Sequence, residues 1–155
     1  MYFQTIENNS ASWTDRLNSF SDSTGLNSIL VMQSLPTTMK VVLANHQPVY
    51  SANDEGPKSV QEGCHELYCE RVIDTKKELL VSNASVDPEW VNNEDLVKFG
   101  LGTYLGLPLI VNDKAVGTVC VLNDKEFDFH AGSPSAYDQL IAFKTELEQE
   151  MIASL

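Results

Sequence analysis

The chain has 155 residues, about one domain's length, and its ten Lys and Arg against 22 Asp and Glu give a formal net charge of −12. That charge repels phosphate backbones and anionic lipid surfaces, so we expect neither a nucleic-acid partner nor membrane contact. With no apolar run near the roughly 18 residues of a membrane span, and no signal-like region in residues 1–9, we expect a cytoplasmic domain with reduced cysteines.

The first half of the chain predicts a helix followed by a hairpin. Residues 10–20 carry apolar side chains at helical spacing, and Ser12 is a candidate N-cap. Residues 28–35 and 39–46 are rich in aliphatic and β-branched residues and flank a Pro-Thr-Thr turn. This pattern predicts an antiparallel hairpin.

A loop, a helix and a strand are predicted next. Residues 47–57 shift to Pro, Asn, Asp, Gly and Ser, which indicates a loop, although a further strand could lie in residues 47–51. Residues 59–73 follow a helical pattern, and the segment "ELLVSNA" after them is predicted to form a strand.

The second half predicts short helices, a second hairpin and a long final helix. Residues 85–102 contain Asp-Pro and Asn-Glu-Asp helix starts, and Gly100 and Gly102 end the last of them. The hairpin spans residues 102–124. The final helix is predicted to begin with Ser133 as N-cap and Pro134 at its first position, and to run to the end of the chain.

This order of elements predicts an α+β fold with a mostly antiparallel sheet of five or six strands. Within the second hairpin, Tyr104 and Gly106 share one face of their strand with Pro108, and the intervening leucines share the other. The leucine face needs a helix layer. Gly106 leaves room on the opposite face for a ligand or for a neighbouring backbone; alternatively, Gly106 and Gly117 merely accommodate twist or a bulge.

Two segments together resemble a known sensory family. "LYCERVIDTKKELLVSNASVDPEWVNN" and "TYLGLPLIVNDKAVGTVCVLND" are similar to the GAF domain, with an aromatic-Cys pair, an Asn-Ala strand end, an Asp-Pro turn, and Tyr-x-Gly-x-Pro-Leu and Gly-Thr-x-Cys-x-Leu strands in that order. The resemblance implies one domain over residues 1–155. It also implies terminal helices bundled on one face of the sheet and, on the other, a pocket closed by loops and short helices.

The resemblance also implies a function and a place for it. We expect a non-catalytic bacterial sensory or regulatory domain that binds a small molecule, or relays a dimer rearrangement to an output domain such as a histidine kinase or diguanylate cyclase, or does both. The alternatives are a thiol enzyme similar to the free methionine sulfoxide reductases and a pure dimerisation module whose pocket is filled by its own side chains. The pocket is expected between the strand at residues 104–110 and the segment 87–102. The candidate ligand-binding residues are Tyr104, Gly106, Trp90, Phe99, Cys120 and Thr118.

Some of these candidates have a second interpretation. Trp90 and Phe99 lie in the segment that closes the pocket in this family, and each can either stack on a ligand or fill the space itself. The Tyr104 hydroxyl can bond a ligand or a backbone group. Glu94 and Asp95 lie at a predicted helix start, where the helix dipole favours them, so we interpret them as capping residues.

The cysteines raise three further possibilities. His65 and Cys69 are four residues apart, as two ligands on one helix face would be, but further ligands at a comparable spacing are missing and we expect no metal. The Cys64-His65 pair resembles a bilin attachment site but precedes the central strand. The placement of Cys69 with Arg71 nearby resembles the thiol site of the free methionine sulfoxide reductases, but this sequence lacks their second cysteine in a Gly-Val-Cys-Gly arrangement. We therefore predict no catalytic residue, and no residue specifies a cofactor.

The final helix carries an apolar stripe at steps of three or four residues. It consists of Leu140, Phe143, Leu147, Met151 and Leu155. We expect this helix, residues 134–155, to continue as a coiled coil into an output module and to form part of a parallel homodimer. The alternative is that the stripe packs only on the leucine face of the sheet, which explains Met151 and Leu155 less well because they would overhang the domain.

Overall fold

The structure is a computed structural model that describes residues 2–59 and 67–155. Within them, six strands form a single sheet in the order β3-β2-β1-β6-β5-β4, and every neighbouring pair is antiparallel. The strands are β1 (Ser28–Ser34), β2 (Thr38–Ala44), β3 (Glu55–Pro57), β4 (Leu79–Val81), β5 (Thr103–Val111) and β6 (Lys114–Asn123). The helices are α1 (Gln4–Asn8), α2 (Ser10–Thr24), α3 (Tyr68–Thr75), α4 (Glu94–Phe99), α5 (Ala136–Ala153) and the 3₁₀ helix η1 (Ala84–Val86). The predicted α+β fold is confirmed.

The sixth strand is β3, and not the predicted segment 47–51. The side chain of Gln47 explains the difference, because its Oε1 accepts hydrogen bonds from the backbone N–H groups of Val49 and Tyr50, both at 2.8 Å. These bonds hold the backbone in a local turn, and the N–H groups are then not available to a strand ladder.

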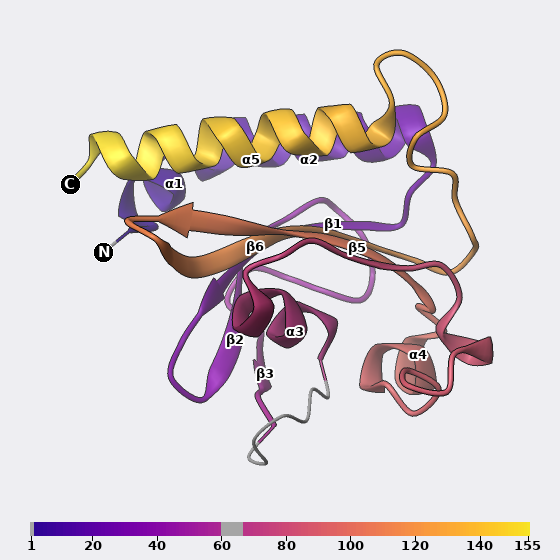
Figure 1. The fold of residues 1–155 in the computed structure, drawn as a ribbon. Helices are drawn as coiled ribbons and strands as arrows, with labels where there is room; N and C mark the ends of the chain where they lie inside the picture. The colour runs from indigo at the N-terminus through magenta and orange to yellow at the C-terminus, as the bar shows by residue number, and fades with distance from the viewer. Residues whose placement is uncertain (1, 60–66) are drawn as a thin grey trace.

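Helices α1, α2 and α5 cover one face of the sheet (Figure 1). Leu105, Leu107 and Leu109 of β5 point into this layer and are at most 2% exposed. Phe143 of α5 packs edge-on against Phe20 of α2, with ring centroids 5.6 Å apart. The prediction of a leucine face under a terminal helix layer is therefore confirmed.

The helix starts differ from two of the predicted caps. Helix α2 begins at Ser10, with Asn9 rather than Ser12 as its N-cap. Helix α5 begins at Ala136, with Ser135 rather than Ser133 as its N-cap. The Ser135 side chain accepts from the backbone N–H of Asp138 at 3.0 Å, and the Asp138 carboxylate accepts from the Ser135 N–H at 3.1 Å. This reciprocal capping box requires an acceptor three residues after the cap, which Ser135 has and Ser133 lacks.

Most of the apolar stripe of α5 is used inside the molecule. Leu140, Phe143, Leu147 and Met151 are all buried, and Met151 is 0% exposed. The expectation that Met151 overhangs the domain is therefore wrong, because helix α1 and the sheet lie beneath the last turns of α5 (Figure 1). Leu155 is 60% exposed.

Gly117 lies where β6 and β1 approach closely. A Cβ atom built on Gly117 would lie 2.0 Å from the backbone oxygen of Met32. One residue before it, the β5–β6 register shifts. For Gly117, the interpretation that the glycine accommodates a bulge is therefore the correct one.

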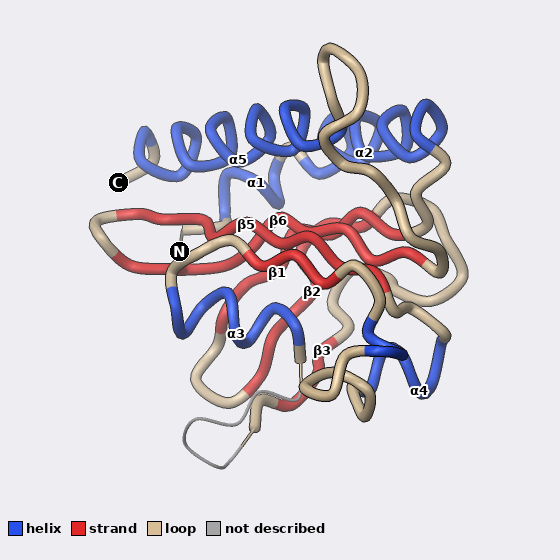
Figure 2. Tube along the Cα trace, turned by 45° about the vertical axis from the view of Figure 1, so that its right-hand side comes forward, coloured by secondary structure: helices blue, strands red, loops and turns tan. Residues whose placement is uncertain are grey.

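The other face of the sheet is covered by α3, α4 and the loops around them (Figure 2), and Ala84 of η1 belongs to the same core cluster. Of the helix predicted over residues 59–73, the described part is helical from Tyr68 onward as α3, which continues to Thr75, whereas Leu67 is an extended cap residue. Cys64 and His65 lie outside the described residues. In the described part of the chain, no helix has the length and apolarity to cross a membrane.

Candidate ligand pocket

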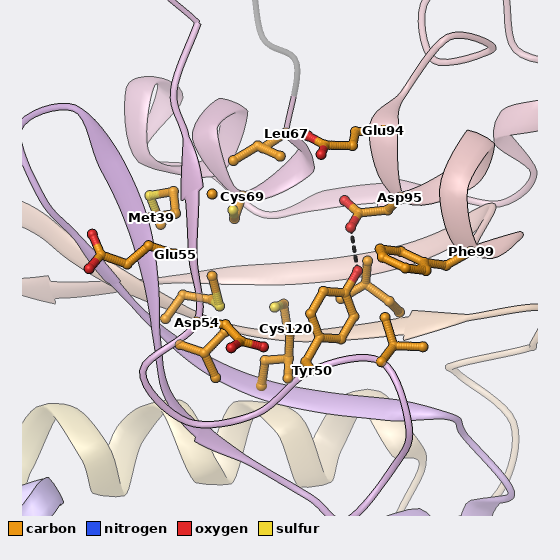
Figure 3. Close-up of a pocket in the computed structure, with 16 residues that line it drawn as sticks. Met39, Tyr50, Asp54, Glu55, Leu67, Cys69, Glu94, Asp95, Phe99 and Cys120 are labelled. Atoms are coloured by element: carbon orange, nitrogen blue, oxygen red, sulfur yellow. Dashed lines mark hydrogen bonds between the residues drawn. The ribbon is translucent and has the colours of Figure 1, made fainter.

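A pocket of about 280 Å³ lies on the face of the sheet opposite the helix layer (Figure 3). Its floor is apolar and is built from β1, β2 and β6, with Leu67 beside it. The lining residues are Leu30, Met32, Met39, Val41, Val49, Tyr50, Asp54, Glu55, Gly56, Leu67, Cys69, Glu94, Asp95, Phe99, Cys120 and Leu122. A cavity of this size and apolarity is the usual form of a small-molecule site.

Two segments far apart in the sequence close the pocket on one side. The Tyr50 hydroxyl, from the loop between β2 and β3, donates a hydrogen bond to the Asp95 carboxylate of α4 (Figure 3). The rings of Tyr50 and Phe99 meet edge to face, with centroids 6.0 Å apart. Asn93 fixes the start of α4, accepting from the backbone N–H of Asp95 at 2.9 Å. We call this contact of loop and helix the roof of the pocket.

The pocket lining is acidic. Asp54, Glu55, Glu94 and Asp95 line it, and its described lining contains no Lys, Arg or His. Burial raises the pKa of Asp95, and the hydrogen bond from Tyr50 partly offsets that shift. Burial also raises the pKa of the Tyr50 hydroxyl, so it stays protonated and able to donate.

Two of the six predicted ligand-binding residues, Phe99 and Cys120, line the pocket. Strand β5 contributes no lining residue, so the pocket lies nearer β1 and β2 than predicted. A Cβ atom on Gly106 would lie 2.1 Å from the Tyr104 hydroxyl, so the ring of Tyr104 fills the space above Gly106. Thr118, also buried, lies outside the lining.

Trp90 fills space rather than lining the pocket. It is 3% exposed, and its ring centroid lies 5.0 Å from that of Tyr68. Tyr68 in turn stacks on Tyr104 at 4.8 Å and donates a hydrogen bond to the Leu101 carbonyl at 3.1 Å. The rings of Trp90, Tyr68 and Tyr104 therefore pack as one aromatic cluster.

The sequence matches the GAF domain family over residues 13–142. The chain belongs to this family. No curated protein sequence matches the chain.

Solved structures agree with the assignment of this GAF domain at the level of the fold. The GAF domain of the Acinetobacter phosphoenolpyruvate-protein phosphotransferase is 14% identical, with a TM-score of 0.65 over 90% of this chain and 79% of that one. A methyl-accepting chemotaxis protein is 14% identical, with a TM-score of 0.65 over 88% and 83%. The type II free methionine-R-sulfoxide reductase of Thermoplasma acidophilum is 7% identical, with a TM-score of 0.66 over 96% and 95%.

The two thiols of this GAF domain that lie in described residues are buried, which disfavours the thiolate form. Cys69 and Cys120 are free and buried, and both line the pocket. Burial raises the pKa of Cys69 well above its ordinary value and raises that of Cys120 to about 12, although Thr118 and Tyr104 beside Cys120 act in the opposite direction. Both groups are thiols rather than thiolates at neutral pH, and only the thiolate is a strong nucleophile.

Two hydroxyls beside Cys120 lack an ordinary hydrogen bond. The hydroxyls of Tyr104 and Thr118 are fully buried and have no partner of normal geometry among the described residues. Both hydroxyls interact with the Cys120 thiol, which is a weak hydrogen-bond partner when protonated. An unpartnered buried hydroxyl lowers stability, which gives a direct test of this geometry.

Sequence reasoning missed most of the polar lining. Tyr50 and Asp54 come from a segment predicted to be a loop, with a possible strand over residues 47–51, and no local pattern shows that it folds over the sheet. Glu94 and Asp95 lie in the first turn of α4, as predicted, but Asn93 is its N-cap, and both acidic residues also line the pocket. Two acidic residues directly after an Asn cap were the one available signal.

Proposed function

We propose that this GAF domain is a non-catalytic sensory or regulatory domain that binds a small molecule in the pocket and relays binding to an output domain. The observation that carries the proposal is the pocket itself: an apolar floor on the central strands, under a roof formed by Tyr50, Asp95 and Phe99. The fold similarity to a chemotaxis protein supports a signalling role.

The floor strands offer a route from the pocket to the helix layer. In β6, Cys120 and Leu122 lie on the pocket side, whereas Val119 and Val121 pack beneath the helices. A ligand that shifts β6 would therefore move residues that support α5. The proposal includes a homodimer through the terminal helices, with a histidine kinase or diguanylate cyclase as output. The exposed sides of α2 and α5 are the surfaces available for it, because the stripe of α5 is largely buried.

The test is whether a small molecule occupies the pocket. Native mass spectrometry of protein purified from cells should find an added mass that disappears in Val41→Phe, whose larger side chain enters the pocket. Val86→Phe is the matched control, since Val86 is 78% exposed and lies outside the lining. If no mass is retained and no compound in a broad thermal-shift screen stabilises the wild type more than Val41→Phe, the binding proposal is wrong.

A second candidate function is free methionine sulfoxide reduction. The similarity to the Thermoplasma reductase and the presence of Cys69 and Cys120 in one pocket favour it. The raised pKa values of both thiols oppose it, because thiolate attack needs a lowered pKa. NADPH consumption with thioredoxin, thioredoxin reductase and free methionine sulfoxide distinguishes the two candidates: turnover would contradict the non-catalytic proposal.

A further inference from the structure

The pocket lining combines carboxylates and aromatic rings, with no basic side chain among its described residues. We propose that its ligand is an organic cation: an ammonium group attached to an apolar body. This inference rests on the proposed function, since it names the chemical class that the same pocket would bind.

The first argument is charge. Asp54 and Glu55, both solvent-exposed, follow the loop on one side of the pocket, and Asp95 lies in the first turn of α4 on the other. Their hydrogen bonds come from neutral donors: the Ser51 N–H to Asp54 at 2.9 Å, the Thr38 hydroxyl to Glu55 at 2.7 Å, and the Tyr50 hydroxyl to Asp95. With the described residues, none of the three forms an ion pair.

The fourth carboxylate differs. Glu94 pairs with Lys98 one turn later on α4, at the exposed surface of the helix. The pocket lining as a whole therefore keeps negative charge that the described residues do not neutralise. A cation entering the pocket gains that attraction, whereas an anion such as a phosphate or carboxylate is repelled.

The second argument is aromatic. Phe99 is 46% exposed although it lines the pocket, and the Tyr50 ring meets it edge to face. Aromatic faces attract ammonium groups, and rings placed beside carboxylates are the usual means of recognising alkylated amines. Exposure of a large aromatic ring at the opening is unfavourable in the free protein, and a ligand over it removes that exposure.

The third argument is the floor. Leu30, Met32, Met39, Val41 and Leu122 present an apolar surface without charge, and the pocket holds about 280 Å³. A simple inorganic cation gains nothing from such a floor, because its remaining ligands would be hydrocarbon. The apolar floor therefore favours a ligand with a hydrocarbon part, and the carboxylates and aromatic rings of the lining favour a positive charge on it.

The experiment uses three probes of equal length and different charge: n-hexylammonium, hexan-1-ol and hexanoate. Binding is measured from amide chemical shifts of the ¹⁵N-labelled chain at constant ionic strength. We expect the ammonium to bind about tenfold more tightly than the alcohol, and hexanoate to bind most weakly. The shifts should centre on α4 and the 47–54 loop.

Two variants separate the charge from the ring. Asp95→Asn keeps an oxygen that can accept from Tyr50 but removes the charge, and should reduce ammonium affinity about fivefold while leaving the alcohol unchanged. Asp22→Asn on the exposed side of α2 makes the same change of net charge outside the pocket and should have no effect. Phe99→Leu keeps apolar bulk and should also lower the preference for the ammonium.

The outcomes are distinguishable. If the alcohol or hexanoate binds in the pocket as tightly as the ammonium, the charge inference is overturned and the pocket proposal stands. If Asp95→Asn and Asp22→Asn have equal effects, the attraction is non-specific and the inference is also overturned. If none of the probes binds and the purified protein carries no ligand, the proposed function itself fails.

Discussion

Replacing Thr118 by Val should make the protein more stable. The Thr118 hydroxyl is fully buried and has no hydrogen-bond partner of normal geometry among the described residues. In the unfolded chain this hydroxyl is hydrogen-bonded to water, and folding removes that bond without replacing it. A buried hydroxyl without a hydrogen bond costs about 1–3 kcal/mol, and Val has nearly the same shape with a methyl group in its place. We expect a gain of about 1 kcal/mol in the free energy of unfolding, or roughly 2–4 °C in Tm.

Thr103 provides the matched control. It is 3% exposed in the neighbouring strand β5, but its hydroxyl donates a hydrogen bond to the Ser82 carbonyl at 2.9 Å. Thr103→Val removes that bond and leaves a carbonyl without its partner, so stability should fall by about 1–2 kcal/mol. The two substitutions are chemically identical, and the sign of the change depends only on the partner.

The assay is urea unfolding followed by circular dichroism, with the m value compared between variants. An unchanged m value with a raised midpoint for Thr118→Val and a lowered one for Thr103→Val is the expected result. If Thr118→Val is destabilised as much as Thr103→Val, the Thr118 hydroxyl has a partner in solution, such as the Cys120 thiol or a buried water, and the reasoning is wrong.

Three other predictions concern a cap, a thiol and the roof. Ser135→Ala should lower the free energy of unfolding by about 1 kcal/mol in thermal melts, whereas Ser133→Ala should be neutral. The pKa of Cys120 rises from 9.0 to about 12 on folding, so the thiol of the unfolded state loses its proton at a lower pH than that of the folded state. Between these two pKa values, the free energy of unfolding should therefore fall by up to about 1.4 kcal/mol per pH unit. Cys120→Ala should lack this contribution to the pH dependence of stability. Tyr50→Phe should raise the pKa of Asp95 further in a carboxyl ¹³C NMR titration, since the hydrogen bond that favours its charged form is removed; an unchanged pKa would contradict the contact.

The parts of the fold that sequence predicted correctly depend on local patterns. The two faces of β5 follow from alternation along one strand, and α4 follows from Asn93 before it and Gly100, with φ of 71°, after it. The start of α5 was also a local question. The Ser133-Pro pattern predicts the wrong start, because Ser135, and not Ser133, has the required Asp138 three residues later.

The pocket could be predicted only in part because its walls are brought together by long-range contacts. Tyr50 and Asp95 are 45 residues apart, and no spacing rule joins them. Gly106 illustrates the opposite error: a missing side chain suggested free space, but the space is taken by Tyr104 from two residues earlier in the same strand. A glycine in a strand indicates that another group approaches the backbone closely, but the sequence does not identify that group.

Because side chains alternate along β6, neighbouring residues of this strand face the pocket on one side of the sheet and the helix layer on the other. Cys120 lies against the pocket, and Val119 and Val121, its immediate neighbours in the chain, belong to the core shared with the helices. In the proposed function, a ligand that tilts β6 from the pocket side would displace Val119 and Val121, which pack in the core shared with α5. The proposed signal would then pass from the pocket to the helix layer through β6 itself, without a loop or hinge between them.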